Sequence, residues 1–153
     1  MTTVVLNGVD EVSVAVGRHF GYSEWLEVTQ DRVNLFAEAT GDFQWIHVDV
    51  ERATKESPYG GPIAHGYLTM ALSNMLVPTV VTVDGFQMGI NYGVDRVRFP
   101  APVPVGARVR AGVELLEVTE VSGGLQTRMQ ITMEVEGSEK PACVIESLSR
   151  WVL

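Results

Sequence analysis

The sequence predicts an α+β domain in which an antiparallel sheet curves around one long apolar helix. Residues 67–76 are apolar on nearly every side, which is typical of a helix wrapped by other structure. The second half of the chain contains a run of long strand-like segments that do not alternate with helices, which argues against an α/β fold. The 153 residues, 46% of them hydrophobic, fit one domain (1–153) with a substantial core.

The first predicted helix begins after Thr29. Residues 1–28 are loosely patterned, with a short strand expected at 25–28. Thr29 is a typical N-cap, and Asp31 in the first turn suits the helix dipole. Gly41 occupies the position of a glycine that ends a helix. The side chains that share one helix face are Val33, Phe36, Ala37 and Thr40.

A non-helical stretch, a short turn and the long helix follow. Residues 42–50 are expected to be irregular, residues 50–55 to form one helical turn, and residues 57–62 to form a Pro- and Gly-rich loop. The long helix starts near His65 and runs to about residue 81. It contains Asn74 and Pro78 and is too short and too polar to span a bilayer. With no signal peptide visible, a cytoplasmic protein is expected.

The remaining segments are predicted strands. Residues 85–99 alternate, with Val94, Arg96 and Arg98 on one side, and a Pro-rich break follows at 100–106. Residues 108–119 alternate again, and Gly123-Gly124 is a hairpin signal before strands at 125–136 and 142–153. The inward side of the 108–119 strand is expected to carry Val109, Ala111, Val113 and Leu115.

Charge and cysteine content exclude several classes of protein. Eleven Lys and Arg residues against nineteen Asp and Glu residues give a net charge of −8, which disfavours a nucleic-acid partner. Because Cys143 is the single cysteine, the chain cannot form an intrachain disulfide. Its apolar neighbours predict a buried thiol in a strand.

The most informative chemistry lies in Asp42 and His47, which are five residues apart directly after Gly41. Alone, Asp42 fits a turn residue and His47 a core histidine. As a pair, an ionised carboxylate and a neutral imidazole can both accept protons from a water held between them. Phe43 and Trp45 flank the pair and would help to exclude bulk water, whereas Asp49 is expected to cap the next turn.

The start of the long helix supplies a candidate electrostatic partner. The first amides of a helix are unpaired and lie at its positive end. A thioester carbonyl resting on the Gly66 amide would be polarised, and the enolate formed by water attack would be stabilised. The alternative is that Gly66 only permits tight packing.

A metal site is the weaker interpretation of the same residues. Asp42, His47, Asp49 and His65 are possible ligands, but no His-x-x-x-His motif or cysteine pair supports a zinc site. There is also no Gly-x-Ser-x-Gly elbow, phosphate-binding loop or dinucleotide fingerprint.

The segments 36–49 and 63–68 resemble the MaoC-like (R)-specific enoyl-CoA hydratases. Residues 90–93 (Ile-Asn-Tyr-Gly) and 98–103 (Arg-Phe-Pro-Ala-Pro-Val) resemble a mycobacterial-type branch of them. The resemblance implies the hot-dog fold, a helix wrapped by an antiparallel sheet. It further implies reversible syn addition of water to a trans-2-enoyl-CoA, giving the (R)-3-hydroxyacyl product.

The resemblance also assigns roles. Asp42 and His47 would activate the water, the Gly66 amide would form the oxyanion hole, and no metal or redox cofactor is expected. The partners implied are an acyl-CoA thioester and a second copy of the chain in a homodimer. The candidate substrate-binding residues are Gln44, Trp45, Tyr67, Asn91 and Arg98. The basic residues available for CoA phosphates are Arg52, Lys55, Arg96 and Arg98.

One departure from the family pattern lies inside the motif. Gln44-Trp45 stands where Asn-Pro is common, and Trp45 cannot reproduce the fixed φ of proline. The spacing from Asp42 to His47 is kept, so the catalytic assignment is kept. The competing hypotheses are a dehydratase acting on acyl carrier protein, a hot-dog thioesterase, and a non-catalytic acyl-CoA-binding subunit.

Overall fold

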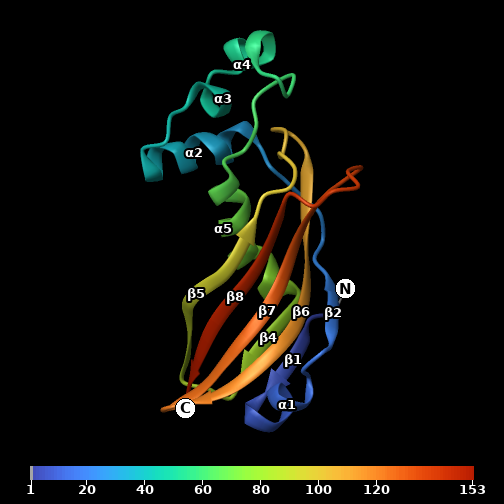
Figure 1. Cartoon of the computed structure of the whole chain (residues 1–153), viewed down its shortest axis with the longest axis vertical. Helices are drawn as coiled ribbons and strands as arrows, with labels where there is room; N and C mark the ends of the chain where they lie inside the picture. Colours follow the sequence, from blue (N-terminus) through green and yellow to red (C-terminus); the bar gives the residue numbers. More distant parts are fainter. Residues whose placement is uncertain (1) are drawn as a thin grey trace.

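A computed structural model describes residues 2–153 and shows a six-stranded sheet curved around helix α5 (Figure 1). The sheet has the order β2-β6-β7-β8-β5, and β3 also pairs with β6. All its pairings are antiparallel. The strands are β1 (Val4–Asn7), β2 (His19–Tyr22), β3 (Leu26–Glu27), β4 (Val81–Asp84), β5 (Met88–Arg98), β6 (Arg108–Val121), β7 (Gly124–Val135) and β8 (Cys143–Val152). The helices are α1 (Gly8–Val14), α2 (Gln30–Thr40), α3 (Trp45–Val48), α4 (Val50–Glu56) and α5 (Gly66–Val80).

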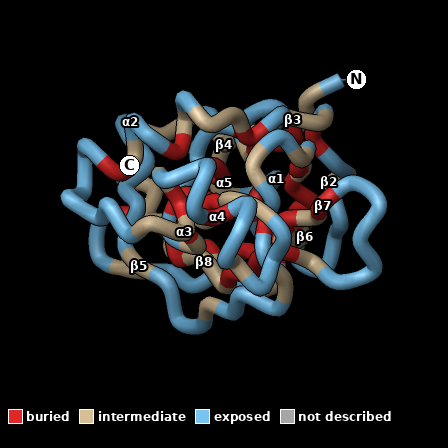
Figure 2. The backbone as a smooth tube through the Cα atoms, turned by 90° about the horizontal axis from the view of Figure 1, so that it is seen from above, coloured by how far each residue is buried: buried red, intermediate tan, exposed pale blue. Residues whose placement is uncertain are grey.

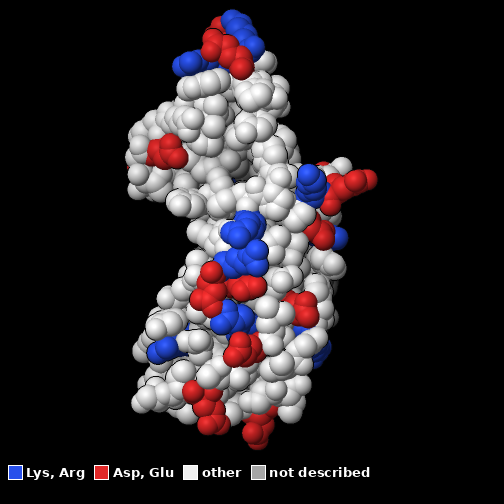
Figure 3. Space-filling model, in the orientation of Figure 1, with Lys and Arg blue, Asp and Glu red and all other residues white. Residues whose placement is uncertain are grey.

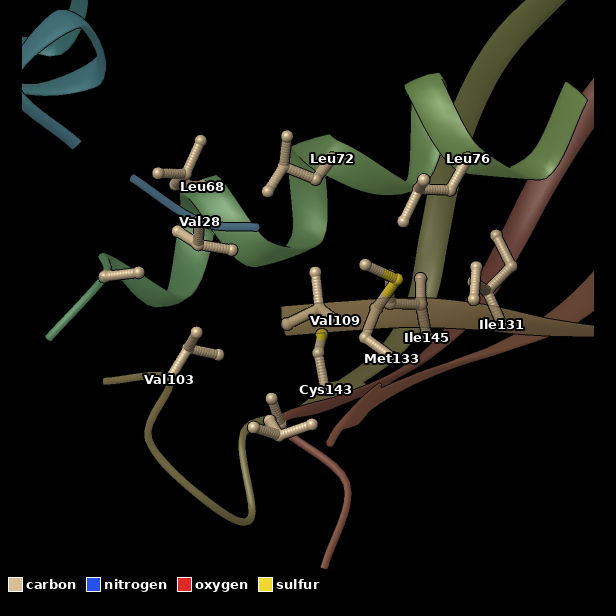
Figure 4. Packing of buried hydrophobic residues seen from close by; sticks show 14 of the residues in the cluster. Val28, Leu68, Leu72, Leu76, Val103, Val109, Ile131, Met133, Cys143 and Ile145 are labelled. Atoms are coloured by element: carbon tan, nitrogen blue, oxygen red, sulfur yellow. The ribbon is translucent and has the colours of Figure 1, made fainter. Parts of the chain in front are cut away.

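The core lies between α5 and the concave face of the sheet. Leu68, Leu72 and Leu76 of α5 belong to the same buried cluster as the sheet residues Met133 and Ile145 (Figure 4). Burying each leucine contributes about 1.5–3 kcal/mol. The view from above shows buried segments gathered around α5 and exposed ones at the periphery (Figure 2).

Several predicted elements are confirmed. Thr29 caps α2 by accepting from the Arg32 amide at 3.2 Å, and Gly41 ends it with a left-handed φ of 77°. Asp49 caps α4, and Cys143 is fully buried in β8. The four inward residues predicted for β6 are all at 0% exposure: Val109, Ala111, Val113 and Leu115.

Three expectations are wrong. Residues 45–48 form the short helix α3 rather than an irregular segment, because the His47 and Asp49 amides bond to the Gln44 and Trp45 carbonyls. Residues 1–28 are expected to contain one strand, at 25–28, but β1, α1 and β2 precede it. The parallel pairing of β1 with β4 could not be predicted from any local pattern. Phe43 is 57% exposed and does not shield the pair from water within this chain.

The predicted alternation of β5 also fails at its centre. Register shifts occur between Asn91 and Gly93 and between Val94 and Arg96. Val94 pairs with Ser147 and Arg96 with Glu146, which are consecutive residues of β8 and therefore face opposite sides. Val94 and Arg96 thus do not share a face.

The helices α2, α3 and α4 lie beyond one end of the sheet, above the N-terminal end of α5 (Figure 1). No helix among residues 2–153 has the length and apolar character that crossing a bilayer requires.

Candidate active site

His47 is buried, 6% exposed, on the short helix α3. Its Nδ1 lies 2.7 Å from the carbonyl oxygen of Ile63, and because a carbonyl only accepts, Nδ1 must carry the proton. The Nε2 of the neutral ring is then left as a lone-pair acceptor. The Ile63 amide in turn donates to the Ile46 carbonyl at 3.0 Å, so the two segments hold each other. This arrangement fixes the tautomer that a general base needs.

His65 stacks on His47 and ties down the acidic loop. The two ring centroids are 3.9 Å apart with an interplanar angle of 26°. The Nε2–H of His65 donates to the backbone carbonyl of Asp42 at 3.0 Å, whereas its Nδ1 is buried without a hydrogen-bond partner among residues 2–153. His65 therefore links the N-terminus of α5 to the Asp42 loop.

Asp42 presents its carboxylate at the open side of this cluster. The preceding Gly41 adopts a left-handed conformation that turns the chain out of α2, and Asp42 Oδ1 accepts from the Gln44 amide at 3.3 Å. The side chain remains exposed. Ligand atoms of Asp42, His47 and His65 lie within 4.8 Å of one another. One water can span such a gap, because two hydrogen bonds of about 2.8 Å reach further.

The environment of His47 keeps the imidazole neutral. Burial is the largest effect and lowers the pKa of His47 below its ordinary value of 6.5. The hydrogen bond to the Ile63 carbonyl raises the pKa of His47, and so does the negative charge of Asp42. The neighbouring His65 lowers this pKa further. The net lowering keeps His47 able to accept a proton at neutral and mildly acidic pH.

Gly66 is the first residue of α5, where the amide has no partner within the helix. A β-carbon built at Gly66 would lie 3.2 Å from the ring of Phe99. A larger residue here would require the Phe99 ring to shift by a few tenths of an ångström. The absence of a side chain also lets a ligand approach the amide closely. Both interpretations of Gly66 fit this geometry.

The other predicted site residues divide into two groups. Gln44 and Trp45 begin α3 beside the pair, and the Arg52 guanidinium lies 4.2 Å from the centroid of the Trp45 ring. Tyr67, 68% exposed, lies next to Gly66 with its ring 6.2 Å from that of Phe99. Asn91 instead lines a cavity along the second half of α5. Arg98 lies near the end of β5 and donates only to the carbonyl of Val97.

Sequence reasoning missed one supporting residue, Gln30. Its Nε2 donates to the His47 carbonyl at 2.8 Å and to Asn34 Oδ1 at 2.9 Å, which couples α2 to α3. A contact across seventeen residues leaves no local pattern to find. Of the four candidate metal ligands, Asp49 is occupied with capping α4, while one carboxylate and two imidazoles converge.

Comparison with known proteins shows the family of this chain. The model of the MaoC-like domain matches residues 11–138. The chain belongs to the MaoC-like family. It is 52% identical over 145 residues to 3-hydroxyacyl-thioester dehydratase Z of Mycobacterium tuberculosis, covering 94% of this chain and 95% of that protein. It is 45% identical to Nodulation protein N of Rhizobium leguminosarum bv. viciae, covering 86% and 83% respectively.

Solved structures agree with the fold. The unliganded R-hydratase PhaJ1 of Pseudomonas aeruginosa matches with a TM-score of 0.72 and 25% identity, covering 90% of this chain and 81% of that one. The (R)-hydratase from A. caviae involved in PHA biosynthesis has a TM-score of 0.69 at 24% identity, covering 88% and 94%. The predicted hot-dog fold and the predicted enzyme class, a hydro-lyase, are confirmed.

Proposed function

We propose that this MaoC-like protein is an (R)-specific enoyl-thioester hydratase that acts on trans-2-enoyl-CoA and runs reversibly. One observation carries the proposal: a carboxylate oxygen of Asp42 and a ring nitrogen of His47 lie within 4.8 Å of each other, the hydrogen bond of His47 Nδ1 to Ile63 leaves Nε2 as the proton acceptor, and the neighbouring His65 precedes the first amide of α5. Similarity to a 3-hydroxyacyl-thioester dehydratase and to an R-hydratase supports the reaction class.

The geometry supports a simple course for hydration. A water held by Asp42 and His47 Nε2 attacks C3 while the C2=C3 electrons move toward the thioester oxygen, which rests on the Gly66 amide. One of the two bases takes a proton from the water, and a proton then passes to C2 of the enolate. The result is net addition of H and OH to one double bond. A substrate bound with one face of its double bond toward both bases would receive H and OH on that face, which makes the addition syn.

The carrier of the thioester bears on the basic residues. Arg52 and Lys55 on α4 already pair with Glu56 and Glu51 at 3.0 and 2.8 Å. Arg96 and Arg98 line a smaller cavity of about 290 Å³ near the end of β5. Acidic and basic groups alternate over the visible sheet face rather than forming one basic patch (Figure 3). Because Arg52 and Lys55 are already paired with carboxylates while Arg96 and Arg98 line one cavity, Arg96 and Arg98 are our candidates for binding CoA phosphates.

We also propose a homodimer that joins the two sheets through β5. This strand ends the sheet, so no strand among residues 2–153 pairs with its outer edge. It carries large apolar side chains that are 44–54% exposed: Met88, Ile90, Tyr92 and Val94. An exposed, apolar edge strand is suited to pair with a second copy.

The function is tested by loss of enoyl-thioester absorbance with crotonyl-CoA, with the chirality of the product determined. We expect hydration to the (R)-3-hydroxy product, unchanged after dialysis against a metal chelator. Release of free CoA thiol instead would indicate a thioesterase, and tight binding without turnover would indicate a non-catalytic subunit. Faster turnover of the matched carrier-protein thioester would identify an acyl-carrier-protein dehydratase.

The dimer is tested by light scattering of the purified chain. Wild type should have twice the mass of one chain, and Ile90→Lys together with Val94→Lys should give monomers. Val14→Lys, at an 83% exposed site on α1, is the matched control and should stay dimeric. A monomeric wild type would contradict the proposal.

A further inference from the structure

A cavity of about 510 Å³ lies beside the second half of α5, away from the Asp42–His47 pair. It is bounded by α5, β4, β5, β7 and β8, and none of Asp42, His47 or Gly66 lines it. Ser73 and Pro78 mark its extent along the helix. At about 1.5 Å per residue, they lie about 10 and 18 Å from Gly66 along the helix axis.

The wall that β8 contributes changes character along the strand. Cys143 and Ile145 are buried against α5 as members of the core. Residues two apart share a strand face, so Ser147 and Ser149 continue this inward face and line the cavity. A face that begins with apolar packing thus presents two hydroxyl groups where the cavity opens.

Several polar side chains around the cavity make no hydrogen bond within residues 2–153. Among residues 2–153, the side chains of Asn74, Asn91, Ser147 and Ser149 make no hydrogen bond to another protein group. Pro78, inside α5, has no N–H, so the Asn74 carbonyl also lacks its usual helical donor. Donors and acceptors from three elements therefore converge on one space.

The rest of the wall is apolar. Val77, Met129 and Ile131 contribute aliphatic surface. The Nε1–H of Trp151 donates to Thr127 Oγ1 at 3.0 Å, so the ring contributes only apolar surface to the cavity. A group that suits this cavity has a hydrocarbon body and a polar substituent.

We propose that this cavity receives the far part of the substrate's acyl chain and selects a neutral, oxygen-bearing tail, such as a hydroxyacyl or oxoacyl chain. The inference rests on the proposed hydratase function. A plain hydrocarbon would displace water from Asn74, Asn91, Ser147 and Ser149 without replacing its hydrogen bonds, whereas a hydroxyl or carbonyl group replaces them. Asp84 on the same wall disfavours a carboxylate tail.

The position of the cavity sets the length of the chain. With C–C bonds of about 1.5 Å, an extended chain advances about 1.3 Å per carbon. A tail that follows α5 from a thioester carbonyl at Gly66 reaches the cavity after roughly eight carbons and its far end after roughly fourteen. A four-carbon substrate does not reach it.

A matched pair of substrates tests the inference: trans-2-dodecenoyl-CoA and its 12-hydroxy analogue, with crotonyl-CoA as the short reference. We expect kcat/KM for the hydroxylated chain to exceed that for the plain chain by about tenfold or more. The 12-carboxy analogue should be the poorest of the long substrates.

Variants show whether the cavity causes the preference. Ser147→Ala combined with Ser149→Ala should bring the ratio of the two long substrates close to one while crotonyl-CoA turnover stays at the wild-type value. Ser13→Ala, at an exposed position on α1, is the control and should keep the ratio.

The outcomes separate the two proposals. Wild type that hydrates crotonyl-CoA but treats both long substrates alike overturns the cavity inference and leaves the hydratase intact. A preference that survives the double serine variant also overturns it. Wild type without any hydration activity overturns the proposed function itself, and with it this inference.

Discussion

The two halves of helix α5 border very different surroundings. At its N-terminal end, His47, His65 and the Asp42 loop are buried or bound through specific hydrogen bonds, each to a backbone carbonyl or amide. Along its second half, the cavity lining includes the side chains of Asn74, Asn91, Ser147 and Ser149, which make no hydrogen bond to another group within residues 2–153. Catalytic groups must be held in a fixed position. A group that binds a polar tail must have a donor or acceptor that the protein does not already use. The proposed site of reaction and the proposed site of tail selection thus lie along different halves of one helix.

The fixed end depends on backbone ties rather than on regular structure. Two backbone hydrogen bonds hold residues 57–65 in place. The Ile63 amide donates to the Ile46 carbonyl at 3.0 Å, and the Ala64 amide donates to the Val103 carbonyl at 2.8 Å. Gln30 adds a third tie through the carbonyl of His47. Changes at this end should therefore affect rate, and changes at the other end should affect choice of substrate.

The largest expected effect comes from the two proton acceptors. Asp42→Asn and His47→Gln should each lower kcat for crotonyl-CoA by about 10²–10⁴-fold. Because both act on the same water, the double variant should be little worse than either single one. The measurement is kcat with the melting temperature as a check of folding.

Asp49→Asn is the matched control for this prediction, because it removes a carboxylate from the same segment while asparagine still caps α4. It should keep the wild-type kcat. Full activity in Asp42→Asn and His47→Gln, or fully additive losses, would contradict the assignment of one shared water.

The next effect separates the two interpretations of Gly66. Gly66→Ala should push against the Phe99 ring and lower kcat by about tenfold to a hundredfold. If the amide binds the oxyanion, adding Phe99→Leu should restore stability but not kcat. Recovery of both by the second substitution would show that Gly66 serves packing alone.

These tests concern residues that the sequence could place only in part. The cap at Thr29, the terminating Gly41 and the apolar α5 follow local rules, so a single sequence predicts them. The stack of His65 on His47 and the tie from Gln30 depend on segments that meet only after folding. Likewise, the bulges in β5 are set by pairing with β8, so the alternation of residues 94–98 was misleading.

A smaller effect is expected at His65, which we interpret as a positioning residue. His65→Phe keeps a ring beside His47 but removes the donor to the Asp42 carbonyl, worth about 1 kcal/mol, so kcat should fall by about fivefold. Removing the neighbouring imidazole should also raise the pKa of His47, which moves the acidic limb of the kcat/KM profile to higher pH. A fall in kcat with an unmoved profile would indicate a structural role only.

The smallest effect is on stability, and its sign follows from His47. Since the pKa of His47 is lowered in the folded protein, mainly by burial, the unfolded chain binds more protons as the pH falls below about 6.5. This contribution to the free energy of unfolding is fully present above pH 6.5 and is lost as the pH falls through the folded pKa. Urea unfolding at pH 7.5 and 5.5 should show a steeper loss for wild type than for His47→Gln. Equal losses in the two proteins would mean that the pKa of His47 is the same in the folded and the unfolded chain. That result would contradict the conclusion that the N-terminal end of α5 holds His47 in a buried environment that keeps the imidazole neutral.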